Sequence, residues 1–190
     1  MGDWTSATYI TSQIAVVIAY ILLASSYFIK SRSKLLLTAI GSNTGEGIAW
    51  VLLGGWVGVW MCIIAIARDI VAHIVQGRRT PAQNAKIMRA DWWWLGLWTL
   101  LFAVSTILFN HIDSSGLGWL AFLTTMIFTI SIWQKNIFIY RLLGIFVSIG
   151  WIIYNFLLNS VFGWTLESIL LIFVIAGLIT YLRNQKRLTK

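Results

Sequence analysis

Seven long apolar stretches dominate this chain of 190 residues. A helix needs about 20 mostly apolar residues to cross the ~30 Å hydrocarbon core of a bilayer, and each stretch reaches or approaches that length. Charged residues make up only 11% of the chain, against about 25% in a soluble domain. The sequence therefore predicts an all-α membrane protein with seven transmembrane helices. The predicted helices cover residues 7–29, 35–53, 56–75, 92–109, 117–133, 137–158 and 165–182.

The breaks between these stretches carry turn residues and charge. Only two glycines, Gly54 and Gly55, separate the second stretch from the third, which predicts a tight antiparallel hairpin. The single proline, Pro81, lies in a polar break over residues 76–91. The single cysteine, Cys62, cannot form an intramolecular disulfide and so says nothing about the redox compartment. The first residues show no basic segment and no cleavage pattern, so no removable signal peptide is expected.

The basic residues indicate the orientation of the chain. With seven spans, all of them lie on, or lean toward, one side of the membrane, whereas Asp3 and Asp113 lie on the other. The basic residues are Lys30, Arg32, Lys34, Arg68, Arg78, Arg79, Lys86, Arg89, Lys135, Arg141, Arg183, Lys186, Arg187 and Lys190. Because cytoplasmic loops carry the excess of Lys and Arg, we expect the N-terminus outside and the C-terminus in the cytoplasm. The net charge of +8 then reflects topology and contact with anionic lipid, not nucleic-acid binding.

An internal repeat is predicted from similar segments at a constant spacing. Gly55-Trp56 recurs as Gly163-Trp164, and the basic tails that start at 76 and 184 lie 108 positions apart as well. This pattern predicts one transmembrane domain over 1–190, built as 3+1+3 helices: a first repeat (7–75), a linker helix (92–109) and a second repeat (117–182). Parallel repeats are a known transporter plan, in which the substrate site lies near mid-membrane between the repeats.

The candidate site residues are polar or aromatic side chains within the predicted spans. Ionisable groups there are costly and mark functional sites by default. Asn43, Glu46 and Trp50 are spaced i, i+3 and i+7, which places them on one face of a helix. The 108-residue spacing matches Asn43 with Trp151, Glu46 with Tyr154 and Gly47 with Asn155. Together these residues suit a small polar ligand with hydroxyls or a positive charge, because indole faces attract cations. The alternative is that they bond and pack neighbouring helices.

Six further residues are interpreted separately: Glu167, Arg68, Asp69 and the three tryptophans over 92–94. Glu167 is either a site residue, wetted near the outer surface, or a cap near the positive end of its helix. Arg68 and Asp69 are adjacent and are expected to point to different faces. Arg68 is expected to extend to the cytoplasmic interface, and Asp69 can pair with His73 at i+4. Trp92, Trp93 and Trp94 are expected to form part of an interfacial aromatic belt.

The second half of the chain carries a family resemblance. The run over 151–155, followed by Ser160, Gly163, Glu167 and the basic tail over 181–187, resembles the bacterial inner-membrane YgjV family. This chain has Tyr154 where that family has a His. The resemblance implies a multi-pass protein of the bacterial inner membrane and leaves its chemistry open. More distantly, the 3+1+3 plan is similar to PnuC vitamin transporters and SWEET/PQ-loop sugar facilitators, although the PQ dipeptide is absent here.

Enzyme motifs are missing from the sequence. There is no Cys/His ligand cluster and no phosphate-binding glycine loop, so we expect no catalytic activity, metal or cofactor. The sequence favours a facilitator or secondary transporter for a vitamin-like, sugar-like or cationic solute that alternates its access. The main alternative is a receptor that senses a ligand with the same fold, and a membrane-embedded enzyme is a weaker one. Substrate, coupling ion and homo-oligomerisation stay open.

Overall fold

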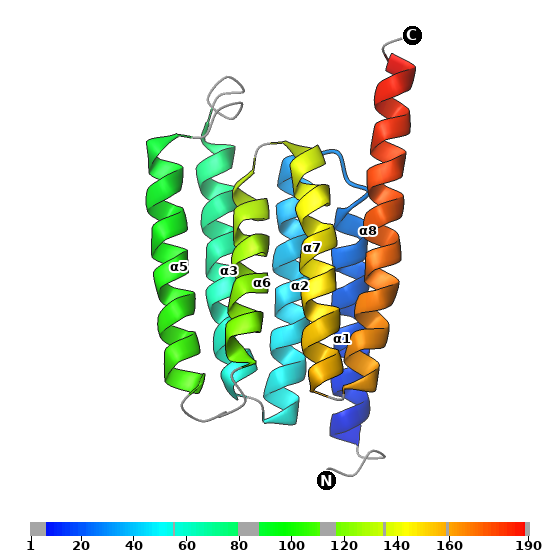
Figure 1. Ribbon diagram of the computed structural model, residues 1–190. Coiled ribbons are helices and arrows are strands. Elements are labelled where there is room, and N and C mark those ends of the chain that lie inside the picture. The colour runs from blue at the N-terminus through cyan, green and yellow to red at the C-terminus, as the bar shows by residue number, and fades with distance from the viewer. Residues whose placement is uncertain are drawn as a thin grey trace. The chain divides into compact units, whose positions relative to one another are not determined.

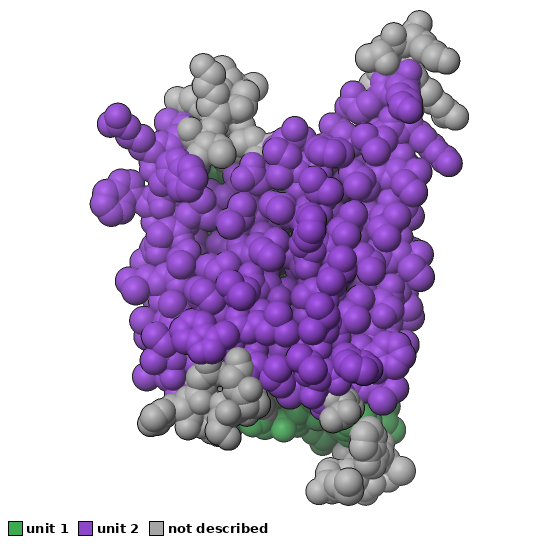
Figure 2. Space-filling model, in the orientation of Figure 1, with its two compact units in different colours: residues 1–77 green, residues 78–190 purple. Residues whose placement is uncertain are grey.

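The computed structural model describes residues 7–54, 56–79, 88–110, 117–134, 136–158 and 160–188. These residues form seven α-helices in the described part of the chain (Figure 1). The helices divide into two compact units, residues 1–77 and 78–190 (Figure 2). Of the residues singled out in the sequence, those outside the described residues are Asp3, Gly55, Pro81, Lys86, Asp113, Lys135 and Lys190.

Unit 1 contains α1 (Ala7–Ser26), α2 (Arg32–Leu53) and α3 (Trp56–Gly77). The middle helix, α2, packs against both of the others. Two of its glycines face α1: a Cβ on Gly45 would lie 3.0 Å from the Cβ of Ala19, and one on Gly41 would lie 3.0 Å from Leu22 Cδ1. Small residues four apart let two helices approach closely in a membrane, and this is how α2 packs against α1.

The turn between α2 and α3 depends on Gly54. Its φ of 71° is left-handed, a conformation that glycine adopts without a steric penalty. Its N–H donates to the carbonyl of Val51 at 3.2 Å, and its own carbonyl accepts from the N–H of Trp56 at 3.1 Å. The turn therefore ends α2 and starts α3 within three residues, as the predicted tight hairpin requires.

Unit 2 contains α5 (Arg89–Asn110), α6 (Gly118–Trp133), α7 (Ile137–Leu157) and α8 (Val161–Leu188). Each of these helices packs against the next one in the chain. Side chains cap three of the helix starts. Asp91 accepts from the N–H of Met88 at 2.9 Å before α5, Asn136 from Phe138 at 2.8 Å in α7, and Ser160 from Gly163 at 3.3 Å in α8.

Aromatic and basic side chains hold the helices of unit 2 together. The Trp94 ring stacks with Trp98 at 6.3 Å and with Trp133 of α6 at 6.4 Å, centroid to centroid. Arg141 of α7 donates to the Gly177 carbonyl of α8 at 2.9 Å and lies 5.0 Å from the centre of the Tyr181 ring. These contacts join an early residue of one helix to a late residue of the next, so both pairs run antiparallel.

The observed helices agree with the predicted ones to within a few residues at most ends. The largest difference is α8, which begins at Val161 and continues to Leu188, four residues earlier and six later than predicted. Ser160 supplies a cap upstream of the apolar run, and Lys, Arg and Gln are good helix formers beyond it. Likewise, α2 begins at Arg32, three residues before its apolar stretch.

Five of the helices are long and apolar enough to cross a membrane: α1, α3, α5, α7 and α8. The other two differ for separate reasons. α2 has 22 residues but carries Gly, Ser, Asn, Thr and Glu over positions 41–47, which lowers its hydropathy. α6 is apolar but has 16 residues, or about 24 Å at 1.5 Å per residue. For α2 and α6 the predicted spans stay predictions.

Apart from Arg68, which lies within α3, the described basic residues of each unit gather at one end of its helices. In unit 1, Lys30, Arg32 and Lys34 surround the start of α2. In unit 2 the basic end is formed by the starts of α5 and α7 and by the end of α8, and its residues are Arg78, Arg79, Arg89, Arg141, Arg183 and Lys186. The positive-inside rule predicts that the end of a membrane protein with such an excess of Lys and Arg faces the cytoplasm. Which end faces the cytoplasm stays a prediction.

Candidate functional site

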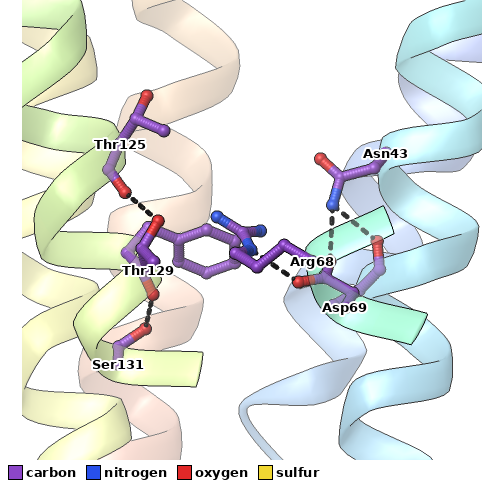
Figure 3. A network of polar contacts seen from close by, with 8 residues as sticks. Asn43, Arg68, Asp69, Thr125, Thr129 and Ser131 are labelled. Atoms are coloured by element: carbon purple, nitrogen blue, oxygen red, sulfur yellow. Dashed lines mark hydrogen bonds and ion pairs between the residues drawn. The ribbon is translucent and has the colours of Figure 1, made fainter. Parts of the chain in front are cut away.

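The polar centre of unit 1 is a network that links α2 to α3 (Figure 3). Asn43 Nδ2 of α2 donates to Asp69 Oδ2 of α3 at 2.8 Å, and Arg68 Nε donates to Asp69 Oδ1 at 2.8 Å. Arg68 and Asp69 are 1% and 0% exposed. Both carboxylate oxygens of Asp69 thus have a donor, one of them charged, and such charge-assisted bonds are the stronger class.

This network lies deep along both helices. Asn43 is eleven residues beyond Arg32, the first residue of α2, and Asp69 is eight residues before Gly77, the last residue of α3. At 1.5 Å per residue these depths are about 16 and 12 Å. For two helices that span a hydrocarbon core ~30 Å thick, these depths correspond to positions near its middle. A second bond, from Arg32 Nε to Gln76 Oε1 at 3.1 Å, joins the same helices at their basic end.

Three expectations about Arg68 and Asp69 were wrong. Arg68 does not extend to the interface but is buried, and it does not diverge from Asp69 but pairs with it. The long Arg side chain can fold back along its own helix, and near mid-membrane the nearby carboxylate compensates its charge better than a distant interface. The expected pair between Asp69 and His73 does not form either, because Arg68 and Asn43 occupy the two carboxylate oxygens.

Glu46 lies one turn beyond Asn43 on α2 and is partly exposed. Among the described residues, no hydrogen bond or ion pair to its carboxylate is found, unlike those of Asp69 and Asp91. Gly47, its neighbour in the chain, packs against Cys62 of α3, whose Cβ would lie 3.3 Å from an added Gly47 Cβ. Glu46 is therefore a carboxylate within α2 for which the described side chains provide no counter-charge.

Trp50 completes the predicted face of α2. Its indole lies directly over Gly58 of α3, where any Cβ would collide with the ring, and 44% of the residue is exposed. The missing side chain of Gly58 therefore provides the space that holds the indole against α3. Asn43, Glu46 and Trp50 follow one another on one side of α2, as predicted, and we call them the Glu46 face.

The predicted site residues of unit 2 lie toward the turn between α7 and α8. Asn155 is two residues from the end of α7, and its Nδ2 donates to the Trp151 carbonyl at 2.9 Å. The Trp151 and Tyr154 rings meet edge to face at 5.3 Å. The amide of Asn155 is thus engaged within its own helix. Its predicted role in ligand binding, and those of Trp151 and Tyr154, stay predictions.

Glu167 differs from what was expected. It is only 5% exposed, so it is not a wetted surface residue, and it does not cap α8, because Ser160 takes that role. Helix α8 begins six residues before Glu167, which moves this carboxylate about 9 Å along the helix from its end. Its role as a substrate-binding residue stays a prediction.

A family model for bacterial inner membrane proteins, Imp-YgjV, matches residues 10–187. The chain belongs to this family. The resemblance seen in the residues over 151–187 is thereby confirmed and extended to nearly the whole chain. No curated protein and no solved structure matches it. Membership places this Imp-YgjV protein in the bacterial inner membrane, and it specifies neither a substrate nor a reaction.

Membership also leaves the 3+1+3 repeat a prediction, and local structure differs at the two turns that suggested it. Trp56 is the first residue of α3, after the left-handed Gly54, whereas Trp164 is the fourth residue of α8. Gly163 lies within the first turn of α8 and receives the Ser160 cap. The tryptophans of the two Gly-Trp pairs therefore occupy different positions relative to their helix starts.

Proposed function

We propose that this Imp-YgjV protein is a transporter, either a facilitator or a secondary transporter, for a small polar solute. The observation that supports the proposal is the group of polar side chains near the middle of unit 1: the Asn43–Asp69–Arg68 network and, beside it, the carboxylate of Glu46. The proposed cycle opens this region in turn to the two sides of the membrane.

Stability alone gives little reason to keep these groups. A charged residue at a helix centre costs about 2.5–3.5 kcal/mol on insertion scales, and Glu46 has no counter-charge among the described residues. A hydrogen bond between membrane helices returns only about 0.6 kcal/mol on average. Replacing a buried ion pair by apolar residues is often neutral or stabilising. Holding two carboxylates and a guanidinium within α2 and α3 therefore favours a role in binding.

The test begins with the purified protein and a thermal-shift screen against vitamins, nucleosides, sugars and amines. The compounds that stabilise it are then offered as radiolabelled solutes to liposomes that contain only this protein, with empty liposomes as the baseline. A transporter gives protein-dependent uptake. Binding without uptake indicates a receptor, and a chemically changed compound indicates an enzyme. No uptake of any stabilising compound overturns the proposal.

Variants connect the uptake with the site. Glu46→Gln and Asn43→Ala are expected to reduce uptake strongly. Thr44→Val is the matched control, because Thr44 is exposed on the same helix and its hydroxyl bonds only the Ile40 carbonyl, at 2.8 Å. Asn155→Ala tests the predicted contribution of unit 2. If Glu46→Gln and Asn43→Ala both transport as the parent does, these residues only connect helices and the site is elsewhere.

A further inference from the structure

The amide of Asn43 is held in one orientation by two acceptors. Its Nδ2 donates to the Ala39 carbonyl at 3.1 Å and to Asp69 Oδ2 at 2.8 Å. A backbone carbonyl can only accept, so this nitrogen cannot exchange places with the amide oxygen. Arg68, which can only donate, holds the other oxygen of Asp69 at 2.8 Å. Both N–H groups of the amide are therefore used, and Oδ1 is left as an acceptor.

The other two residues of the Glu46 face also offer groups that attract a positive charge. Residues three and four apart on a helix are neighbours, about 5–6 Å apart between Cβ atoms, so Glu46 adjoins both Asn43 and Trp50. The carboxylate of Glu46 offers acceptor oxygens, and the indole that lies over Gly58 offers a π face, which attracts cations. The side chains of this face thus offer a carboxylate, an amide oxygen and an aromatic ring.

The charges near this face also favour a cationic ligand. Arg68 and Asp69 compensate each other, whereas Glu46 has no compensating group among the described residues. An anion bound here would add a second negative charge and meet acceptors. A neutral polyol could donate hydrogen bonds but would leave the Glu46 charge uncompensated in a medium of low dielectric constant. An ammonium group satisfies the acceptors and the charge together.

We propose that the Glu46 face binds a small organic cation through its ammonium group, with Glu46 as the counter-ion and Trp50 against the cation. Asp69 acts as a positioning residue, because its bond to Asn43 directs the amide oxygen away from α3. This assignment rests on the proposed transport function for its purpose and names the class of solute.

The first experiment measures binding to the protein in nanodiscs by calorimetry. The probes are putrescine and ethanolamine, with 1,4-butanediol and ethylene glycol as neutral analogues and succinate and glycolate as anions. We expect the amines to bind in preference to both other sets. Glu46→Gln is expected to weaken amine binding about ten- to a hundredfold, since it removes a charge-assisted bond, and Thr44→Val to leave it unchanged. Equal binding of the diols, no binding of either amine, or parent-like binding by Glu46→Gln each overturns the assignment.

The second experiment tests the positioning role of Asp69. Asp69→Asn weakens the acceptor that, together with the Ala39 carbonyl, fixes the Asn43 amide, and it leaves Arg68 without its carboxylate. Both changes disfavour a bound cation, so the preference for putrescine over 1,4-butanediol is expected to fall although Glu46 is intact. Asp69→Glu, which restores the acceptor, is expected to recover part of that preference. A structural loss would lower the melting temperature and would not change the ratio of the two affinities. An unchanged ratio in Asp69→Asn overturns the positioning role.

The two proposals fail separately. Uptake of a neutral or anionic solute without amine binding refutes the cation site and leaves transport standing. Amine binding that depends on Glu46, without uptake of any solute, supports the cation site and refutes transport.

Discussion

The packing of α1 against α2 predicts a graded response to three Gly→Ala substitutions. Alanine favours the helix by about 1 kcal/mol over glycine. Whether the substitution raises or lowers the stability therefore depends on the atoms that the new Cβ meets. Gly96 in α5 has no atom within 4 Å of an added Cβ, and Gly96→Ala is expected to stabilise by about 1 kcal/mol. At Gly41 the new Cβ meets the far end of the Leu22 side chain at 3.0 Å. That methyl can rotate away, so Gly41→Ala is expected to be close to neutral.

In Gly45→Ala the new Cβ meets atoms that cannot rotate away. This Cβ would lie 3.0 Å from the Cβ of Ala19 and 3.2 Å from the Ala15 carbonyl oxygen, atoms that move only with α1 itself. Overpacking costs about 1–3 kcal/mol, which outweighs the gain in propensity and leaves a net loss of up to about 2 kcal/mol. The measurement is reversible unfolding in detergent, followed by tryptophan fluorescence. If Gly45→Ala is as stable as Gly96→Ala, α1 and α2 do not approach as closely as described.

Three other predictions concern single features. Asp91→Ala removes both the ion pair with Arg79 at 2.7 Å and the cap on the N–H of Met88. It is therefore expected to lower the free energy of unfolding by about 1–2 kcal/mol, as measured by chemical unfolding. A stability equal to the parent's would contradict this. Ser148 is buried with no partner for its hydroxyl among the described residues, so Ser148→Ala is expected to keep or raise the melting temperature, and a clear fall would show that the hydroxyl is bonded. Reporter fusions at the C-terminus are expected to report the cytoplasm, and an external reading would refute the predicted topology.

The helices could be predicted well from the sequence because their lengths follow from a single physical requirement. A stretch of about 20 apolar residues spans the bilayer core, and the turn signals at Gly54 and over 159–163 bound the stretches. The ends of α8 were less predictable, since Ser160 starts the helix ahead of the apolar run and basic residues continue it. Hydropathy reports where a chain meets lipid, whereas capping and helix propensity decide where a helix ends.

The candidate site was predictable only along one helix. The period of the α-helix placed Asn43, Glu46 and Trp50 on one face of α2, and the indole contact with Gly58 agrees with that placement. The partner of Asn43 was not predictable, because it depends on the register of α2 against α3. Asp69 was noticed as an ionisable residue within a span, but adjacency in sequence suggested that it diverges from Arg68. Adjacent helix residues point in different directions at Cβ, but the long Arg68 side chain folds back and reaches Asp69.

The low hydropathy of α2 has a structural explanation that bears on mechanism. α2 is the one helix of unit 1 with close neighbours on two sides, so its polar residues can be shared with them. Gly45 faces α1, Asn43 bonds α3, and Glu46 is left over. The glycines, which could have made α2 a point of bending, are instead used for close packing, and the Asn43–Asp69 bond fixes α2 against α3. Close packing against α1 and the Asn43–Asp69 bond to α3 oppose bending of α2 near the Glu46 face. In the proposed transport cycle we therefore expect access to that face to change by movement of the helices of unit 1 together, not by bending within α2.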